Sequence, residues 1–346
     1  MKQRKIAKNT LSTTKRMCFF FTWFSGFLKI LLTEKNMQEF KPVTIEDKEI
    51  LRPYLERYGS SSCQHSLILM TGLSMKYGDE YAIADDVLYV HRSALDCTGE
   101  RYYLAPLGDF NISSPKGEAK FRRSIDLLLE DAAEHGCKAV FYTATEAFKT
   151  LLESSYPTAF EYEYSRDYAE YVYSAESLRV LPGKALRDKR NRVRAFYSAY
   201  EGHVRIEDIS EENMTDVMVF QMEWIKSRLA DGPDELLARE HEAIKFYLSH
   251  FEELEMKGIV VYVRGTVVGY AAGVALNDEC MDEVIEKGRK DITGVYQLLC
   301  NEFALLCCKD YKYINREEDL GVEGLRRAKT SYCPEYMIEK YVVKQI

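Results

Sequence analysis

Hydrophobic and polar positions recur along the chain with two different periods, which predict alternating helices and strands. Between residues 118 and 135, five apolar side chains stand three and four positions apart, as on the buried face of a helix. They are Phe121, Ile125, Leu128, Leu129 and Ala132. Gly136 follows in the position where many helices end. The runs 81–90 and 139–143 instead predict a hairpin around Asp85-Asp86 and a strand.

The same order of elements returns in the second half of the chain. The predicted elements there are helices over 211–229, 235–254 and 296–308, a hairpin over 259–276, and strands over 280–286, 311–315 and 337–343. Both halves run helix, hairpin, strand, helix, strand, helix, strand. We therefore predict an α/β (α+β) fold with two domains, 37–180 and 205–346, each a mixed, mostly antiparallel sheet flanked by helices.

A basic segment at 181–204 separates the two predicted domains, and we predict that it forms a connecting helix. Its cations are Lys184, Arg187, Lys189, Arg190, Arg192 and Arg194, against one acid, Asp188. Its predicted buried side consists of Leu186, Val193, Phe196 and Tyr197. The cations could bind tRNA phosphates, contact anionic lipid, or cover the join between the domains. For nucleic-acid binding the candidates are Lys189, Arg190 and Arg194.

The first 36 residues differ from the rest of the chain in charge. They hold eight Lys or Arg and one Glu, a net charge of +7, which leaves 39 basic and 54 acidic residues, or −15, for the remainder. Their apolar run, 17–32, contains Lys29 and is shorter than the ~20 residues of a spanning helix. Either this segment is an anchor or translation starts at Met37. We predict that residues 1–36 are not part of the fold.

Cysteine and histidine usage limits the classes of site. The nine cysteines include no CxxC pair, and the six histidines show no HxH or HxxxH spacing. We therefore predict neither a disulfide framework nor a metal site, and the pattern favours a reducing, cytoplasmic location.

The densest group of candidate side chains lies near the C-terminus. Asn315, Arg316, Glu317, Glu318 and Asp319 directly follow the predicted strand 311–315, and a helical segment behind them carries Arg326, Arg327 and Lys329. We expect Leu325, Ala328 and Tyr332 to form the buried face of that helix. In α/β proteins, sites tend to form where strands end.

Four segments of the sequence resemble one known family. They are KALRDKRNRVRAF at 184–196, IEKG at 285–288, GVYQ at 294–297 and INREEDLGVEGLRRAKTSYCP at 314–334. Together they resemble DUF2156, which is related to the C-terminal domain of phosphatidylglycerol lysyltransferases. The resemblance covers the chain from about Met37 and implies two tandem GNAT-like folds, as in Fem-type aminoacyltransferases. Members of this family often carry His at the position of Val284.

The resemblance implies acyl or aminoacyl transfer, with these side chains in named roles. Glu286 is the expected base, and Asp319 with Asn315 orients the substrate. The residues expected to hold anionic groups are Lys287, Arg316, Arg326 and Lys329, and Tyr296, in the adjoining turn, is a further expected substrate-binding residue. The alternative is that these side chains form a network of internal ion pairs, which connects the predicted strand to the helical segment after it.

The donor and the acceptor remain open in the sequence. Aminoacyl-tRNA or acyl-coenzyme A could donate the transferred group, and a small molecule or a lipid headgroup could accept it. Contact with a membrane is compatible with a lipid acceptor. The sequence assigns no particular cofactor. The segment 290–296 has one Gly where coenzyme A loops usually have more, so it favours a helix-capping turn, with Asp291 or Thr293 as cap, over a coenzyme A loop. The alternative function is a non-catalytic module that binds RNA or a charged metabolite.

Overall fold

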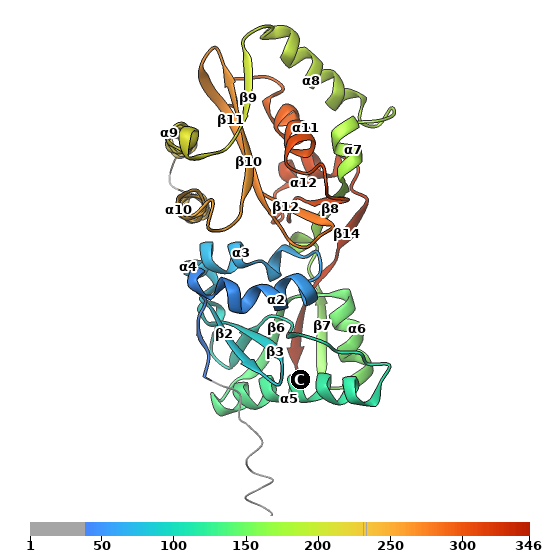
Figure 1. Ribbon diagram of the computed structural model, residues 1–346. Coiled ribbons are helices and arrows are strands. Elements are labelled where there is room, and N and C mark those ends of the chain that lie inside the picture. The colour runs from blue at the N-terminus through green and yellow to red at the C-terminus, as the bar shows by residue number, and fades with distance from the viewer. Residues whose placement is uncertain (1–38, 231, 233) are drawn as a thin grey trace, which may run out of the picture. The chain divides into compact units, whose positions relative to one another are not determined.

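The computed structural model describes residues 39–230, 232 and 234–346, and Phe40–Ile346 form one compact unit (Figure 1). The prediction for residues 1–36 lies outside this range. Within the described part of the chain, no helix combines the length and the apolar character needed to cross a membrane.

The first sheet has the strand order β1-β2-β3-β4-β6-β15-β7, with β5 added to β3. Its strands are β1 (Lys41–Pro42), β2 (Asp79–Ala84), β3 (Val87–Arg92), β4 (Glu100–Tyr103), β5 (Leu107–Gly108), β6 (Lys138–Thr145), β7 (Phe160–Tyr164) and β15 (Lys340–Gln345). The helices of this part are α2 (Lys48–Tyr58), α3 (Leu67–Gly72), α4 (Ser74–Tyr77), α5 (Pro115–Glu134) and α6 (Glu146–Ser155). The hairpin predicted at Asp85-Asp86 is present, and both residues have positive φ.

The second sheet has the order β14-β8-β13-β12-β11-β10-β9. Its strands are β8 (Glu170–Ser174), β9 (Val204–Asp208), β10 (Lys257–Val263), β11 (Thr266–Ala275), β12 (Cys280–Gly288), β13 (Tyr313–Asn315) and β14 (Tyr336–Ile338). Its helices are α7 (Ala175–Val180), α8 (Arg187–Ala199), α9 (Glu211–Leu229), α10 (Glu235–Ser249), α11 (Val295–Leu306) and α12 (Glu323–Thr330). Figure 1 shows α9 and α10 on one face and α11 on the other.

Two strands join the sheet of the other half. β8 precedes the basic segment but pairs with β13 and β14 in the second sheet. β15, the last strand, pairs with β6 and β7 in the first. The single strand expected over 337–343 is therefore two strands in two sheets. The sheets consequently do not divide at residues 181–204, because apolar alternation marks a strand without indicating its partners.

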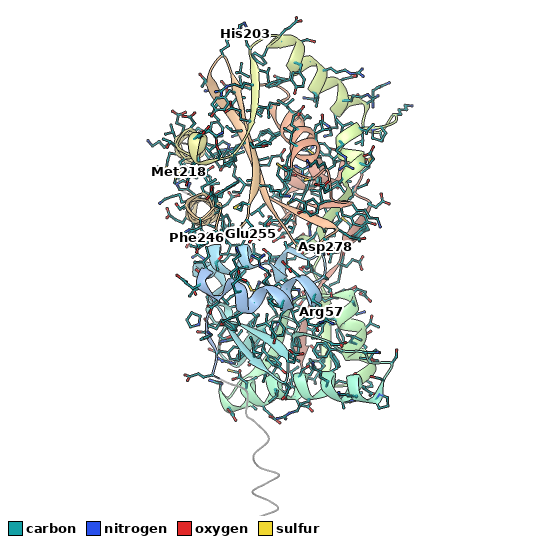
Figure 2. The ribbon with its side chains drawn as sticks, in the orientation of Figure 1. Arg57, His203, Met218, Phe246, Glu255 and Asp278 are labelled. Atoms are coloured by element: carbon teal, nitrogen blue, oxygen red, sulfur yellow. The ribbon has the colours of Figure 1, made fainter. Side chains whose placement is uncertain are left out.

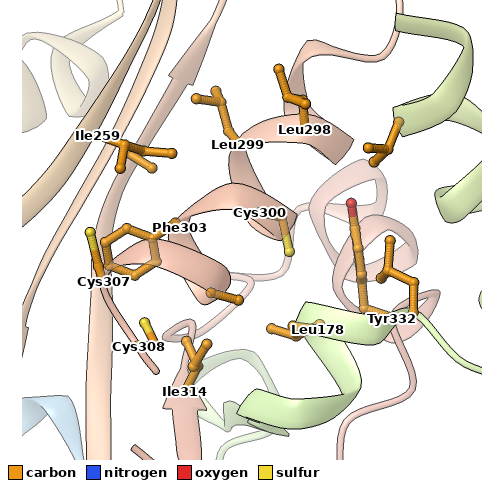
Figure 3. Close-up of a cluster of buried hydrophobic side chains, with 14 of the residues drawn as sticks. Leu178, Ile259, Leu298, Leu299, Cys300, Phe303, Cys307, Cys308, Ile314 and Tyr332 are labelled. Atoms are coloured by element: carbon orange, nitrogen blue, oxygen red, sulfur yellow. The ribbon is translucent and has the colours of Figure 1, made fainter. Parts of the chain in front are cut away.

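The core of the second half forms around α11. Figure 3 shows Leu298, Leu299 and Phe303 of this helix packed between the sheet and α7. α8 adds the buried Leu186, Val193 and Phe196 that its spacing predicts. The prediction that Tyr197 is also buried is wrong, since its ring is 39% exposed and its hydroxyl donates to Glu302 at 2.7 Å.

A gap between two parallel strands determines where polar side chains can gather. β12 and β13 are paired only from Cys280–Tyr313 to Asp282–Asn315. Beyond that point β12 continues beside β11 to Gly288, whereas the chain after Asn315 turns away toward α12. The stretch 315–319 therefore begins where the sheet opens.

Candidate functional site

Asn315 holds the two halves together at the base of this opening. Its amide nitrogen lies 2.5 Å from the Glu170 carboxylate and 2.8 Å from the Ser61 carbonyl oxygen. Glu170 also accepts from the Ser62 hydroxyl and pairs with Lys340 at 2.6 Å, and both members of this ion pair are fully buried. Burial raises the pKa of Glu170, but Lys340 and these donors together leave it below its usual value. In this arrangement Asn315 is a structural anchor.

His65 lies close to this anchor and makes stability depend on pH. Its Nδ1 lies 3.2 Å from the Gly59 carbonyl, its Nε2 has no partner in the described structure, and burial together with Lys340 lowers its pKa to about 4. As pH falls from about 6.5 to 4, His65 therefore binds a proton in the unfolded chain but not yet in the folded chain. This difference lowers the free energy of unfolding.

We expect His65→Gln to remove this dependence. Relative to the wild type, the variant should gain up to about 3 kcal/mol of unfolding free energy between pH 7 and pH 4, measured by urea unfolding. His203→Gln, at an exposed loop position far from this anchor (Figure 2), is the matched control. Parallel pH curves for His65→Gln and the wild type would contradict the assignment.

Arg316 lies between two carboxylates of β12. Its Nε is 2.5 Å from Glu283, and its Nη2 donates to Glu286. One oxygen of each carboxylate has no partner among the described residues. Burial and the charge of Glu286 raise the pKa of Glu283 to about 8, against the opposing effect of Arg316. The structure thus joins the predicted residues Arg316 and Glu286 to an acid with a raised pKa.

Asp319 is the centre of a second group. Its buried carboxylate accepts from the Tyr171 hydroxyl at 2.6 Å and the Gly321 amide at 2.9 Å, and binds both Arg326 and Arg166. Burial raises the pKa of Asp319, but these donors hold it well below its usual value. A carboxylate that remains charged in this way is a poor base, so these contacts favour the ion-pair network for Asp319 and Arg326.

Two of the cations of α12, Arg326 and Lys329, point inward, whereas Arg327 is exposed. Lys329 Nζ donates to the carbonyl oxygens of Arg316 and Glu318, the latter at 2.7 Å. The prediction that Leu325 and Ala328 form the buried face is wrong, since both are exposed, whereas Tyr332 is buried as expected. The physical reason is that Arg326 and Lys329 find a carboxylate and carbonyl groups inside, which satisfy their donors.

Three acids meet on the other side of the same opening. Asp282 is 1% exposed, and neither carboxylate oxygen has a hydrogen-bond partner in the described structure. Burial, Glu317 and Glu318 raise its pKa well above the usual value, and burial with Glu318 raises that of Glu317 to about 8. Glu317 has a positive φ of 57° and one partnerless oxygen. We call Asp282, Glu317 and Glu318 the acidic cluster; the charge of the nearby Lys329 opposes the rise in their pKa values.

The other predicted residues lie in separate places. Lys287 faces α9 and α10, where it pairs with Glu240 at 2.7 Å, so it points away from Glu286 as strand alternation predicts. Tyr296 donates to the Gly288 carbonyl at 3.0 Å. Lys189 lies 4.1 Å from the centre of the Tyr332 ring, beside Arg316.

The remaining two basic candidates on α8 differ in their contacts. Arg190 donates to the Leu181 and Gly183 carbonyls, whereas Arg194 is exposed. A solvent-facing cation is available to a ligand, while one bound to the backbone serves the loop before the helix.

The predicted cap of α11 is wrong in detail. Its N-cap is Gly294, with φ of 87°, whereas Asp291 pairs with Arg289. A Cβ at Gly294 would lie 3.0 Å from the Arg192 carbonyl of α8, so this turn accommodates the neighbouring helix.

Sequence reasoning did not select Asp282 and Glu283 as site residues. The available signal was three acids within the strand 280–288, which is otherwise buried. Charged side chains in a buried strand need partners. These three acids lie directly across from the charged stretch 315–319.

A family model for the C-terminal part of phosphatidylglycerol lysyltransferase matches residues 59–344. An uncharacterised protein of Mycoplasmoides gallisepticum is 25% identical over 176 residues, which are 51% of this chain and 56% of that protein. Thus the alignment spans little more than half the length of this curated relative.

Solved structures show the same fold. A conserved protein of unknown function from Bacteroides thetaiotaomicron has a TM-score of 0.80 at 28% identity, over 89% of this chain and 99% of that one. L-PGS from Bacillus licheniformis has a TM-score of 0.57 at 15% identity, over 88% and 92%. FemX has 0.59 at 8% identity, over 89% and 98%. The predicted fold class, two tandem GNAT-like halves, is confirmed.

Proposed function

Because the chain belongs to the family of the phosphatidylglycerol lysyltransferase C-terminal domain, we propose that it transfers an aminoacyl group from a tRNA ester to a hydroxyl or amine acceptor. The family relationship supports a role like that of aminoacyltransferases. The identities of the amino acid and of the acceptor, a small molecule or a lipid headgroup, are part of the proposal.

The acidic cluster carries this proposal. Every aminoacyl donor brings an ammonium group, and a buried carboxylate without donors is costly unless a cation or a proton satisfies it. Asp282 offers two such oxygens and Glu317 one more. An ammonium group bound between them would supply the missing hydrogen bonds and restore the charged form of these acids.

The Arg316 group supplies the acid–base chemistry. In the reaction, the acceptor oxygen or nitrogen bonds to the ester carbonyl carbon, the bond to the ribose oxygen breaks, and one proton moves from acceptor to leaving group. Glu283, with a pKa of about 8, can take and return that proton. Arg316 keeps Glu283 and Glu286 in place, which assigns the predicted residue Glu286 a supporting role.

The basic helix α8 is the proposed contact for the donor tRNA. Arg194 and the other exposed cations of α8 face solvent, and Lys189 lies beside Arg316. Phosphate contacts of this kind make binding fall steeply with salt. Acyl-coenzyme A remains the alternative donor, but the single glycine before α11 gives it little support.

The direct experiment offers the protein tRNA charged with radiolabelled amino acids, together with amine, hydroxyl and phosphatidylglycerol acceptors. We expect label to leave the tRNA and enter one acceptor class. Label that leaves only at the rate of spontaneous ester hydrolysis with every acceptor, despite tRNA binding, would favour the non-catalytic RNA-binding module.

Asp282→Asn tests the proposed role of the acidic cluster. The change removes one charge from the proposed ammonium site with little change in shape, so we expect the KM for the charged tRNA to rise about tenfold, the loss of one charge-assisted hydrogen bond. Asp278→Asn, at the exposed β11–β12 turn (Figure 2), removes the same charge elsewhere and should leave KM unchanged. Equal KM values for the two variants would contradict the assignment.

A further inference from the structure

A separate cavity in the first half has the chemistry of an anion site. It has a volume of about 370 Å³ and is lined by side chains of the N-terminal half of α5 and of the β2–β3 hairpin. The side chains that matter here are Lys116, Lys120 and Arg123 of α5, Tyr89 of β3, and Asp85 in the turn. None of them belongs to the site proposed above.

The cavity carries positive charge in an acidic protein. Three cations against Asp85 give a net +2, whereas the chain beyond residue 36 carries −15. Lys120 contacts only a backbone carbonyl, that of Asp86, at 3.2 Å, and Arg123 lies 3.5 Å from Glu130. Neither lysine has a carboxylate partner in the described structure, so both can bind an incoming anion.

The position of the lysines on the helix strengthens this inference. Lys116 and Lys120 lie in the first two turns of the 20-residue α5, where the helix macrodipole is positive and cations are unfavourable. Packing does not require Lys116 there, because its side chain is exposed. An anion at this place would be attracted by the side chains and by the helix end together.

Tyr89 provides an independent indication of a ligand. The residue is 1% exposed and lines the cavity, and its hydroxyl makes no hydrogen bond to another described protein atom. The hydroxyl is not one of the buried atoms that lack a partner, so it is accessible and free to donate. A ligand oxygen in the cavity could accept this hydrogen bond.

We propose that this cavity binds the phosphate group of a small ligand, of the size of pyrophosphate. Arg123 offers a planar fork for two phosphate oxygens, and the two ammonium groups neutralise the remaining charge. The inference is independent of the proposed aminoacyl transfer, and its test requires no turnover.

The test is calorimetric titration of the full chain with sodium pyrophosphate, inorganic phosphate and ATP, at constant ionic strength set by chloride. We expect saturable pyrophosphate binding that the double variant Lys120→Ala/Arg123→Ala weakens at least about tenfold, the loss of charged contacts. Lys226→Ala/Lys245→Ala removes the same charge from exposed positions of α9 and α10 and should bind like the wild type. Tyr89→Phe should show a smaller loss.

Each result of the comparison among the three ligands, and of the folding control, has a defined interpretation. Tighter binding of ATP than of pyrophosphate would assign the phosphate to a nucleotide, whereas equal binding would assign it to the phosphate groups alone. If the double variant does not fold, the exposed Lys116→Ala gives the same comparison. Absence of saturable binding of any of the three ligands to the wild type, or wild-type binding by the folded variants, would overturn the proposal.

Discussion

Lys340→Met is expected to destabilise the protein by about 3–5 kcal/mol, because it leaves the buried Glu170 carboxylate without its cation. Both side chains of this pair are fully buried, so water cannot replace the lost partner. Urea unfolding at pH 7 measures the effect. The outer cation of the same strand, Lys344, is 41% exposed and pairs with Glu100 at 3.2 Å. Lys344→Met should therefore cost less than about 1 kcal/mol.

A double variant separates the lost charge pair from the lost packing. Glu170→Gln/Lys340→Met removes both charges, so much of the stability lost in Lys340→Met should return. If Lys340→Met instead unfolds at the same urea concentration as Lys344→Met, the pair does not stabilise the join between the halves.

The location of this pair explains a limit of sequence-based prediction. Glu170 begins β8 and Lys340 begins β15, the two strands that cross between the sheets. In the sequence both stand beside apolar runs and look like polar strand ends. Only the exchange of strands buries them face to face, and nothing local in the sequence encodes that exchange.

The location of the charged stretch 315–319 could be predicted better than the contacts of its side chains. The sequence predicts that the stretch 315–319 follows the end of a strand, and β12 and β13 stop pairing at Asn315. The sequence could not show that Arg316 is shared by Glu283 and Glu286, or that Asp282 faces Glu317. Those contacts depend on the register of β12 against β13, which a one-residue shift would change completely.

Glu283→Gln is expected to reduce aminoacyl transfer about 10²–10⁴-fold, the usual contribution of a general base. In the wild type the base must be deprotonated, so the rate should rise with pH through about 8, the pKa of Glu283. The variant should lose this rise. Transfer rates between pH 6 and pH 9 measure both effects, and Glu302→Gln, which loses only a surface contact to Tyr197, is the control.

Glu286→Gln distinguishes catalysis from a purely structural role. The charge of Glu286 raises the pKa of Glu283, whereas Arg316 lowers it. Removing the Glu286 charge while keeping Arg316 should therefore shift the rise in rate to lower pH without abolishing transfer. An ion-pair network without a catalytic part would predict equal losses in both variants and an unshifted profile. The direction of this shift is a consequence of two carboxylates sharing one guanidinium, and it can be measured without knowing the acceptor's final identity.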